Sequence, residues 1–333
     1  MYGKIIIIMK LTDEQLRALV NAGQLYDAWR DVMLDLTQMP GGMYWRVINS
    51  REYLYKYVTT AGVQQTKYVG PKTQDIEEKY RDFKQAKGSL QERREEIEKR
   101  IRELAPAWRA LRLPAIDSTA GDILRAFDLD STVGQSILVI GTYALKAYEV
   151  EAASAFAAGM DATEDLDFTL FFDRFNADPD LPRRLLLVLR EVDSSFIVAP
   201  STSKTVVNKR GYKVDLLTTS EARQLVASTR PWKPEILEGQ EWLALGKPVK
   251  AVLIDFQGWP VAISAPDPRY FALHKVWLST RLGRPRIKAT KDKNQGEALL
   301  KAIEDHMPHY PIDKAFVEGL PDPLREQSIL LRR

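Results

Sequence analysis

Three aspartates in the second half of the chain have the residue type and spacing of a site that could do chemistry. Asp165 and Asp167 stand two residues apart in a strand-like segment, so both carboxylates point to the same face of that strand. Asp215 lies inside a second, otherwise apolar, strand-like segment. Neighbouring carboxylates repel one another, and burying them without a partner is costly. A divalent cation removes this conflict, and three carboxylates form an oxygen site that suits Mg²⁺ together with substrate phosphates.

A glycine and a small hydroxyl residue precede these aspartates. Gly141 and Thr142 lie where an apolar segment that predicts a strand, Ser136–Gly141, meets an alanine-rich segment that predicts a helix, Tyr143–Phe156. Such a junction lets backbone approach a phosphate closely and offers helix N–H groups to its oxygens. Two divalent ions can hold the attacking and leaving oxygens of an in-line phosphoryl displacement. The combination therefore indicates phosphoryl transfer.

The segments VIGTYAL, TEDLDFTL and YKVDLLT, in this order, resemble the nucleotidyltransferase fold of the DNA polymerase beta superfamily. The resemblance covers Ser136–Thr218. Within that superfamily, the chain more closely resembles bacterial stand-alone nucleotidyltransferases of the AbiEii/MenT toxin type and related uncharacterised proteins of the same fold. Thr163 begins the strand motif of that group, and Lys275 and the Lys291-Asp292 pair stand where the group has a lysine and a Lys-Asp pair in a downstream helical region.

The resemblance implies transfer of a nucleoside monophosphate from an NTP, such as ATP, to an acceptor hydroxyl, with release of pyrophosphate. It implies Mg²⁺ or Mn²⁺ as the cofactor. Acceptors in this class include tRNA ends, other nucleic acids, proteins and small molecules, and the basic segments described below favour RNA. A toxin or defence protein neutralised by a protein antitoxin is implied by the resemblance alone. The alternative is a non-catalytic protein that binds nucleic acid or a protein partner on the same fold.

The resemblance also assigns roles to individual residues. The three aspartates would be catalytic metal ligands, and Asp215 is also the candidate base for the acceptor hydroxyl. Gly141 and Thr142 would hold the triphosphate. Lys275 would reach an NTP phosphate as a point charge, although a lysine that extends from an apolar helix to solvent is the simpler interpretation. Asp292 would assist the acceptor hydroxyl or orient Lys275, unless it only stabilises a helix start.

Two further segments have the composition of a nucleic-acid contact. Met43–Pro71 alternates aromatic or β-branched residues with polar ones and predicts three antiparallel strands. Its basic residues are interleaved with tyrosines, which is typical of a platform for nucleic acid, but a half-buried sheet with a solvated face explains the alternation more simply. The charged residues of Arg281–Lys293 are basic except for Asp292, and the segment is either a contact for phosphates or a solvated loop.

The elements that would position these residues predict an α+β chain. Thr12 and Gln15 fit a capping box at the start of the first helix, and Thr73–Leu104 predicts a long charged helix that could break at Gly88-Ser89. Four segments are expected: an N-terminal helix and small β region (1–72), a charged helical arm and linker (73–118), a nucleotidyltransferase-fold core with a mixed sheet flanked by helices (119–265), and a C-terminal helical region (266–333).

Composition excludes several classes of site. The 333 residues include no cysteine, which excludes disulfides, cysteine–zinc sites and thiol nucleophiles. Only three histidines are present, and His306 and His309 are separated by a proline that should end a helix, so a histidine metal site is not expected. The apolar run Ile5–Met9 is too short to span a membrane, and we expect a cytoplasmic protein with no membrane partner.

Overall fold

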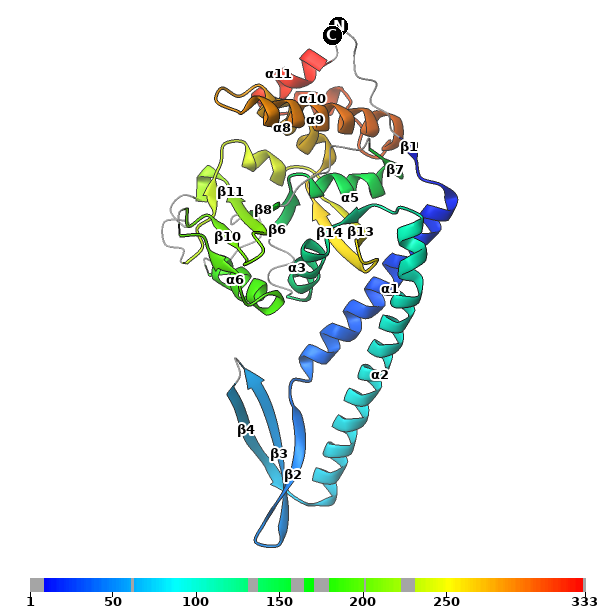
Figure 1. Ribbon diagram of the computed structural model, residues 1–333, viewed down its shortest axis with the longest axis vertical. Helices are drawn as coiled ribbons and strands as arrows, with labels where there is room; N and C mark the ends of the chain where they lie inside the picture. The colour runs from blue at the N-terminus through cyan, green and yellow to red at the C-terminus, as the bar shows by residue number, and fades with distance from the viewer. Residues whose placement is uncertain are drawn as a thin grey trace. The chain divides into compact units, whose positions relative to one another are not determined.

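A computed structural model describes the chain in seven stretches, which are residues 9–60, 63–130, 137–156, 165–170, 180–200, 202–222 and 231–331 (Figure 1). The chain divides into two compact units, one formed by Met1–Gly23 with Ala105–Arg333 and the other by Gln24–Leu104. The backbone enters the smaller unit within helix α1 (Asp13–Gln38) and leaves it within helix α2 (Gln74–Ala110).

The capping box predicted at the start of α1 is confirmed. The backbone N–H of Thr12 donates to Gln15 Oε1 at 2.8 Å, and the N–H of Gln15 donates to Thr12 Oγ1 at 3.2 Å. These reciprocal bonds satisfy two N–H groups that have no partner inside the helix. The helix ends at Gln38, shortly before Pro40.

The three predicted strands of the smaller unit are also confirmed. They form an antiparallel sheet in the order β2 (Gly42–Ile48), β3 (Arg51–Thr60) and β4 (Val63–Pro71). Asn49 and Ser50 join β2 to β3 and both have positive φ, 48° and 60°. Two consecutive residues with positive φ form a turn whose twist matches the right-handed twist of the flanking strands, so this turn determines the register of the hairpin.

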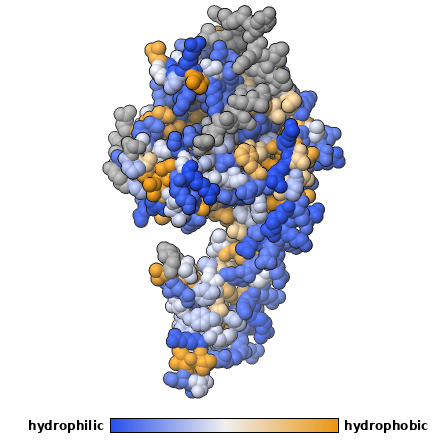
Figure 2. Space-filling view, in the orientation of Figure 1, coloured by the Kyte–Doolittle hydropathy of each residue, from blue (hydrophilic) through white to orange (hydrophobic). Residues whose placement is uncertain are grey.

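Helix α2 is longer than the charged pattern predicted. It continues through Gly88, where the pattern allowed a break, and through Pro106, where we expected a linker. Ion pairs from Glu98 to Arg94 and Arg102, each four residues away, support the helix, and Figure 2 shows a predominantly hydrophilic surface over it. Pro106 lies in the last turns, where Trp108 is buried, so packing outweighs the hydrogen bond that the proline removes.

The main sheet of the larger unit is mixed, as predicted. Its strands, in spatial order, are β6 (Ile137–Ile140), β8 (Asp165–Leu170), β11 (Lys213–Thr218), β10 (Thr205–Val207) and β9 (Ile197–Val198), with β12 (Glu235–Ile236) paired to β11. β8 runs parallel to β11, while β6 and β10 run antiparallel to their neighbours. Leu166 and Phe168 on β8 are fully buried with Val214 and Leu216 on β11, so the residues between them occupy the other face.

Helices α3 (Ser118–Leu129), α5 (Tyr143–Glu151) and α6 (Leu181–Val192) complete this core. Helix α5 is shorter than the predicted Tyr143–Phe156. The chain turns at Ala153, which has a φ of 48°, and Ser154–Ala155 then forms strand β7 against β1 (Met9–Lys10). The alanine-rich composition favours a helix locally, but this strand pairing stops it.

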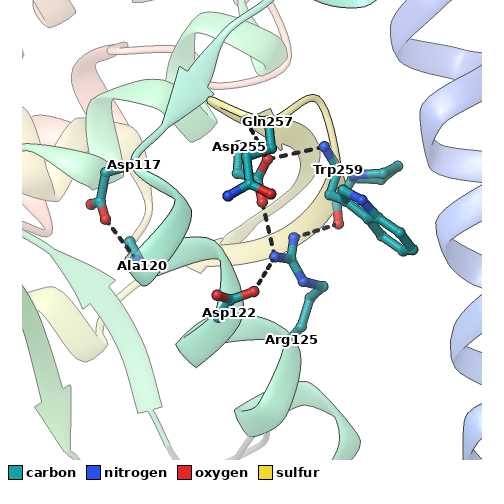
Figure 3. Close-up of polar contacts among 8 residues, drawn as sticks. Asp117, Ala120, Asp122, Arg125, Asp255, Gln257 and Trp259 are labelled. Carbon is teal, nitrogen blue, oxygen red and sulfur yellow. Dashed lines mark hydrogen bonds and ion pairs between the residues drawn. The ribbon is translucent and has the colours of Figure 1, made fainter. Parts of the chain in front are cut away.

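A second sheet consists of the hairpin β13 (Val249–Asp255) and β14 (Pro260–Ala265) with β5 (Ala115–Ile116). A buried ion pair attaches α3 to this hairpin (Figure 3). Arg125 donates to Asp255 Oδ2 at 2.9 Å and to the Pro260 carbonyl at 3.2 Å, and it also pairs with Asp122. Asp255 Oδ1 accepts from the N–H of Trp259 at 3.0 Å. These bonds satisfy both buried charges and determine the position of α3.

The C-terminal region is helical, as predicted. It contains α8 (Pro268–Ser279), α9 (Arg286–His306), α10 (Lys314–Glu318) and α11 (Asp322–Leu331), and it follows the short turns η1 (Ser220–Ala222) and η2 (Gln240–Ala244). Gly296 lets α9 approach α8, because a Cβ there would lie 2.7 Å from the Ala272 carbonyl oxygen. Among the residues that the structure describes, no helix is long and apolar enough to cross a membrane.

Candidate active site

The register of β8 and β11 brings two of the predicted aspartates together. Asp167 and Asp215 are Cα partners on these parallel strands. Asp165 lies two residues before Asp167 and therefore on the same face of β8. Both Asp167 and Asp215 are half-buried, because the neighbouring residues of each strand form the core.

Gly141 lies against the Asp167 carboxylate. β6 pairs with β8 so that Ile140 is opposite Asp167, and the chain then turns at Gly141 with a φ of 67°. A Cβ at Gly141 would lie 2.3 Å from Asp167 Oδ2. The position therefore requires glycine for its backbone conformation and for its contact. Thr142 follows, buried, immediately before the first residue of α5, so the start of that helix adjoins the carboxylate.

The electrostatic environment of the two carboxylates favours a positive partner. The pKa of Asp167 is raised to about 6, mainly by burial and also by the charges of Asp215 and Asp165, while the charges of Lys275 and Lys288 act in the opposite direction. Burial also raises the pKa of Asp215, while a hydrogen bond from the Thr205 side chain lowers it. Carboxylates whose pKa values are raised by burial and by one another are typical of functional sites.

Lys275 lies in a buried ion-pair cluster between α8 and α9. Its Nζ donates to Asp292 Oδ1 at 2.9 Å, and Arg284 Nε donates to Asp292 Oδ2 at 2.9 Å. Lys275 is 8% exposed and Asp292 is 3% exposed. The simpler sequence interpretations are therefore wrong: Lys275 does not extend into solvent, and Asp292 lies beyond the first turn of α9. One carboxylate shared by two cations leaves a net positive charge in this cluster.

The basic run Arg281–Lys293 divides into separate groups. Arg284 joins the ion-pair cluster, and Lys288 lies close enough to Asp167 to lower its pKa. Arg281 instead pairs with Glu238 at 2.7 Å and lies over the Trp277 ring. The sequence identified the run as basic but did not single out Arg284 and Lys288, because composition does not tell which way each basic side chain points.

The sequence analysis also missed a hydroxyl cluster beside the aspartates. Asp117 caps α3 by accepting from the N–H of Ala120, and it accepts hydrogen bonds from the phenols of Tyr143 and Tyr212. Burial, the bond to Asp117 and the charge of Asp165 raise the pKa of Tyr143. The cluster joins the starts of α3, α5 and β11. A tyrosine next to Gly141-Thr142 is the only signal of it in the sequence.

The arrangement fits a magnesium ion through its donor chemistry. Mg²⁺ usually binds through one or two carboxylates and completes its shell with waters and substrate phosphates, and Asp167 and Asp215 offer two adjacent carboxylates. Within the described stretches, no three histidine, aspartate or glutamate side chains are close enough to hold a metal by themselves. Thr163 of the predicted motif and Ser136, the first residue of the predicted strand before Gly141, lie outside the described residues. His306 is the last residue of α9, and His309 contacts Glu151.

Comparison with known proteins agrees with this geometry. A family model described as "Nucleotidyltransferase" matches residues 118–320, which is more than half of the chain. The matched range contains all seven site residues predicted from the sequence, which are Gly141, Thr142, Asp165, Asp167, Asp215, Lys275 and Asp292. No curated protein and no solved structure matches the chain. The chain therefore belongs to this nucleotidyltransferase family and is a nucleotidyltransferase enzyme.

Proposed function

We propose that this enzyme transfers a nucleoside monophosphate from an NTP to an acceptor hydroxyl on RNA, with Mg²⁺ as its cofactor. In the reaction, the acceptor oxygen forms a bond to the α-phosphorus of the NTP. The bond from that phosphorus to the bridging oxygen breaks, and pyrophosphate leaves. The proposal is carried by the juxtaposition of Asp167 and Asp215 on neighbouring strands, with the Gly141 backbone against Asp167.

Asp167 and Asp215 would hold the metal ion, and Asp165 adds a negative charge on the same face of β8. When bound, Mg²⁺ would supply positive charge to the phosphate oxygens of the NTP. Mn²⁺ would bind to the same residues, because it also prefers oxygen ligands. The raised pKa values of Asp167 and Asp215 support this assignment, because a cation offsets the cost of burying these carboxylates and relieves the repulsion from neighbouring charges.

The chain itself would bind the triphosphate and accept a proton. The backbone at Gly141 and Thr142 and the first N–H groups of α5 are placed to receive phosphate oxygens. Lys275 would neutralise the triphosphate, and Asp292 holds its ammonium in position. Asp215 is the candidate that would accept the acceptor proton, because the strand register places it beside Asp167.

RNA is proposed as the acceptor because the residues named on α8, on α9 and between these helices carry more positive than negative charge. Arg284 and Lys275 share the single carboxylate of Asp292, and Lys288 adds a further cation that acts on Asp167. A polyanionic acceptor matches such a surface. The likeness of the sequence motifs to toxin-type nucleotidyltransferases, and a neutralising protein partner, stay predictions.

Transfer from four α-labelled NTPs into total RNA and total protein would test the proposal. We expect label in RNA with the wild type and Mg²⁺, and none with Asp167→Asn. Asp305→Asn is the matched control, because Asp305 lies on the exposed side of α9 in a pair with Lys301. A folded Asp167→Asn variant with full activity would refute the site. Label in protein alone would keep the site and refute the acceptor. RNA binding without any NTP turnover would favour the non-catalytic alternative.

A further inference from the structure

One face of the sheet in the smaller unit is formed by tyrosines. We call this the tyrosine face, and it consists of Tyr44, Tyr53, Tyr55, Tyr57 and Tyr68. Tyr44, Tyr55 and Tyr68 are cross-strand partners on β2, β3 and β4. The ring centroids of Tyr44 and Tyr55 are 5.9 Å apart, and those of Tyr55 and Tyr68 are 5.6 Å apart. The five rings therefore form a continuous aromatic surface across all three strands.

The opposite face of this sheet is packed against α2. Trp45 contacts Tyr80 of that helix with ring centroids 5.5 Å apart, and Leu54 is fully buried. Gly70 permits this packing, because a Cβ there would lie 3.0 Å from Ile76. Successive side chains of a strand point to opposite faces, so the tyrosines point away from α2. The ring contacts that the described structure records for them are with one another.

Exposure agrees with this orientation. Tyr68 is 49% exposed, and the other four tyrosines are half-buried. Half-buried rings that still show their faces can stack with a planar ligand, and aromatic side chains in a row are the recurring platform for successive bases of single-stranded nucleic acid. Such stacking tolerates any sequence because every base has a π-face.

The charge around the tyrosine face complements phosphate. Of the basic residues in this sheet, Arg46 and Arg51 lie on the tyrosine face by their strand register, and the one acidic residue, Glu52, lies on the other face and is paired with Lys72. Arg46 lies on the tyrosine face with its guanidinium 6.0 Å from the centre of the Tyr55 ring. This places a cation within the aromatic row, where it can contact the backbone of a stacked strand. An acidic protein segment would contact the arginine, and an apolar segment would contact the tyrosine rings. Nucleic acid would contact both, with its phosphates on the arginine and its bases on the rings.

We propose that the tyrosine face binds single-stranded RNA, with bases stacked on Tyr55 and Tyr68 and a phosphate held by Arg46. The phenol groups can hydrogen-bond to 2′-hydroxyls, which favours RNA over DNA. This identifies the smaller unit as the part of the enzyme that recruits its acceptor, and in that respect it rests on the proposed function. Binding itself requires neither NTP nor metal.

Fluorescence anisotropy with the full-length protein and a labelled single-stranded RNA of mixed sequence would test the proposal. We expect Tyr68→Ala to raise the Kd about tenfold through loss of one stacking contact, and Tyr68→Phe to have a much smaller effect because it keeps the ring and loses only the phenol hydroxyl. Arg46→Gln should weaken binding and reduce its salt dependence. Lys67→Gln is the matched charge control, because Lys67 is opposite Lys56 on the other face of the sheet. Tyr68 lies on an edge strand and is half exposed, so melting curves should show that each variant stays folded.

The outcomes separate this proposal from the proposed function. Asp305→Asn should bind RNA as tightly as the wild type, since Asp305 belongs to the larger unit and the tyrosine face to the smaller one. Wild-type affinity in Tyr68→Ala would overturn the proposal even if RNA is labelled in the transfer assay. Tyr68-dependent RNA binding without RNA labelling would support the tyrosine face and overturn the choice of RNA as acceptor. Equal affinity for duplex RNA, or Tyr68-dependent binding of an acidic peptide instead of RNA, would also overturn it.

Discussion

Asp215 of β11 lies directly beside Asp167 of β8, because the two strands pair in parallel with these residues as partners. The pair is half-buried, and burial raises the pKa of both carboxylates. Two like charges in this position reduce the stability of the metal-free enzyme. The same charges are what allow the site to bind a cation and, through it, a phosphate.

Replacing one of these charges should therefore stabilise the metal-free protein. We expect Asp167→Asn to melt at a higher temperature than the wild type at pH 8, because it removes the repulsion. Mg²⁺ should raise the melting temperature of the wild type by binding the native state, with little effect on Asp167→Asn. Thermal melts with and without Mg²⁺, at constant ionic strength, measure both effects. A larger Mg²⁺ shift in the variant than in the wild type would contradict the assignment.

Gly141→Ala should abolish transfer and destabilise the fold. The change places a Cβ against Asp167 Oδ2 and forces a non-glycine residue to a φ of 67°. Backbone strain of this kind costs about 1–3 kcal/mol. Gly211→Ala is the control, because Gly211 has a φ of 83° with open space around it. Denaturant unfolding should show a cost in both variants, whereas only Gly141→Ala should lose activity. Equal activity in the two variants would show that the close approach at Gly141 is unimportant.

Asp292→Asn should be strongly destabilising, because it leaves the buried Lys275 and the neighbouring Arg284 without their shared carboxylate. Removing one partner of a buried ion pair typically costs about 3–5 kcal/mol. Asp305→Asn breaks an exposed pair on the same helix and should cost less than about 1 kcal/mol. Chemical denaturation compares the two variants. Lys275→Met should be less destabilising than Asp292→Asn, but it should raise KM for the NTP. The comparison separates the role of Lys275 in phosphate binding from its role in protein stability.

Acid should destabilise the protein through His274. Burial lowers the pKa of this residue to about 3, and its ring stacks on Trp277 with centroids 5.7 Å apart. The unfolded chain binds a proton near pH 6.5 that the folded chain resists, so stability falls as pH falls below that value. His274→Phe keeps an aromatic ring and removes the titration. We expect the wild type to lose stability relative to this variant between pH 7 and pH 5. Parallel curves for the two proteins would contradict this expectation.

Much of the fold could be predicted because it depends on residues close together in the chain. The capping box of Thr12 and Gln15, the turn at Asn49-Ser50 and the hairpin that carries Asp215 all follow from short-range patterns. Helix ends were less predictable, as α5 and α2 show. Local propensity was outweighed there by strand pairing after Ala153 and by packing around Trp108.

The sequence by itself determined that Asp165 and Asp167 share a face and that Gly141 precedes a helix, because strand and helix periodicity follow from backbone geometry. Only the tertiary structure decided that Asp167 lies beside Asp215 and that one carboxylate, Asp292, serves both Lys275 and Arg284. It also brought Tyr143 and Tyr212 to Asp117. The physical reason is that these partners are separated by many residues, and their distance depends on how the sheet and helices pack, which residue order alone does not specify.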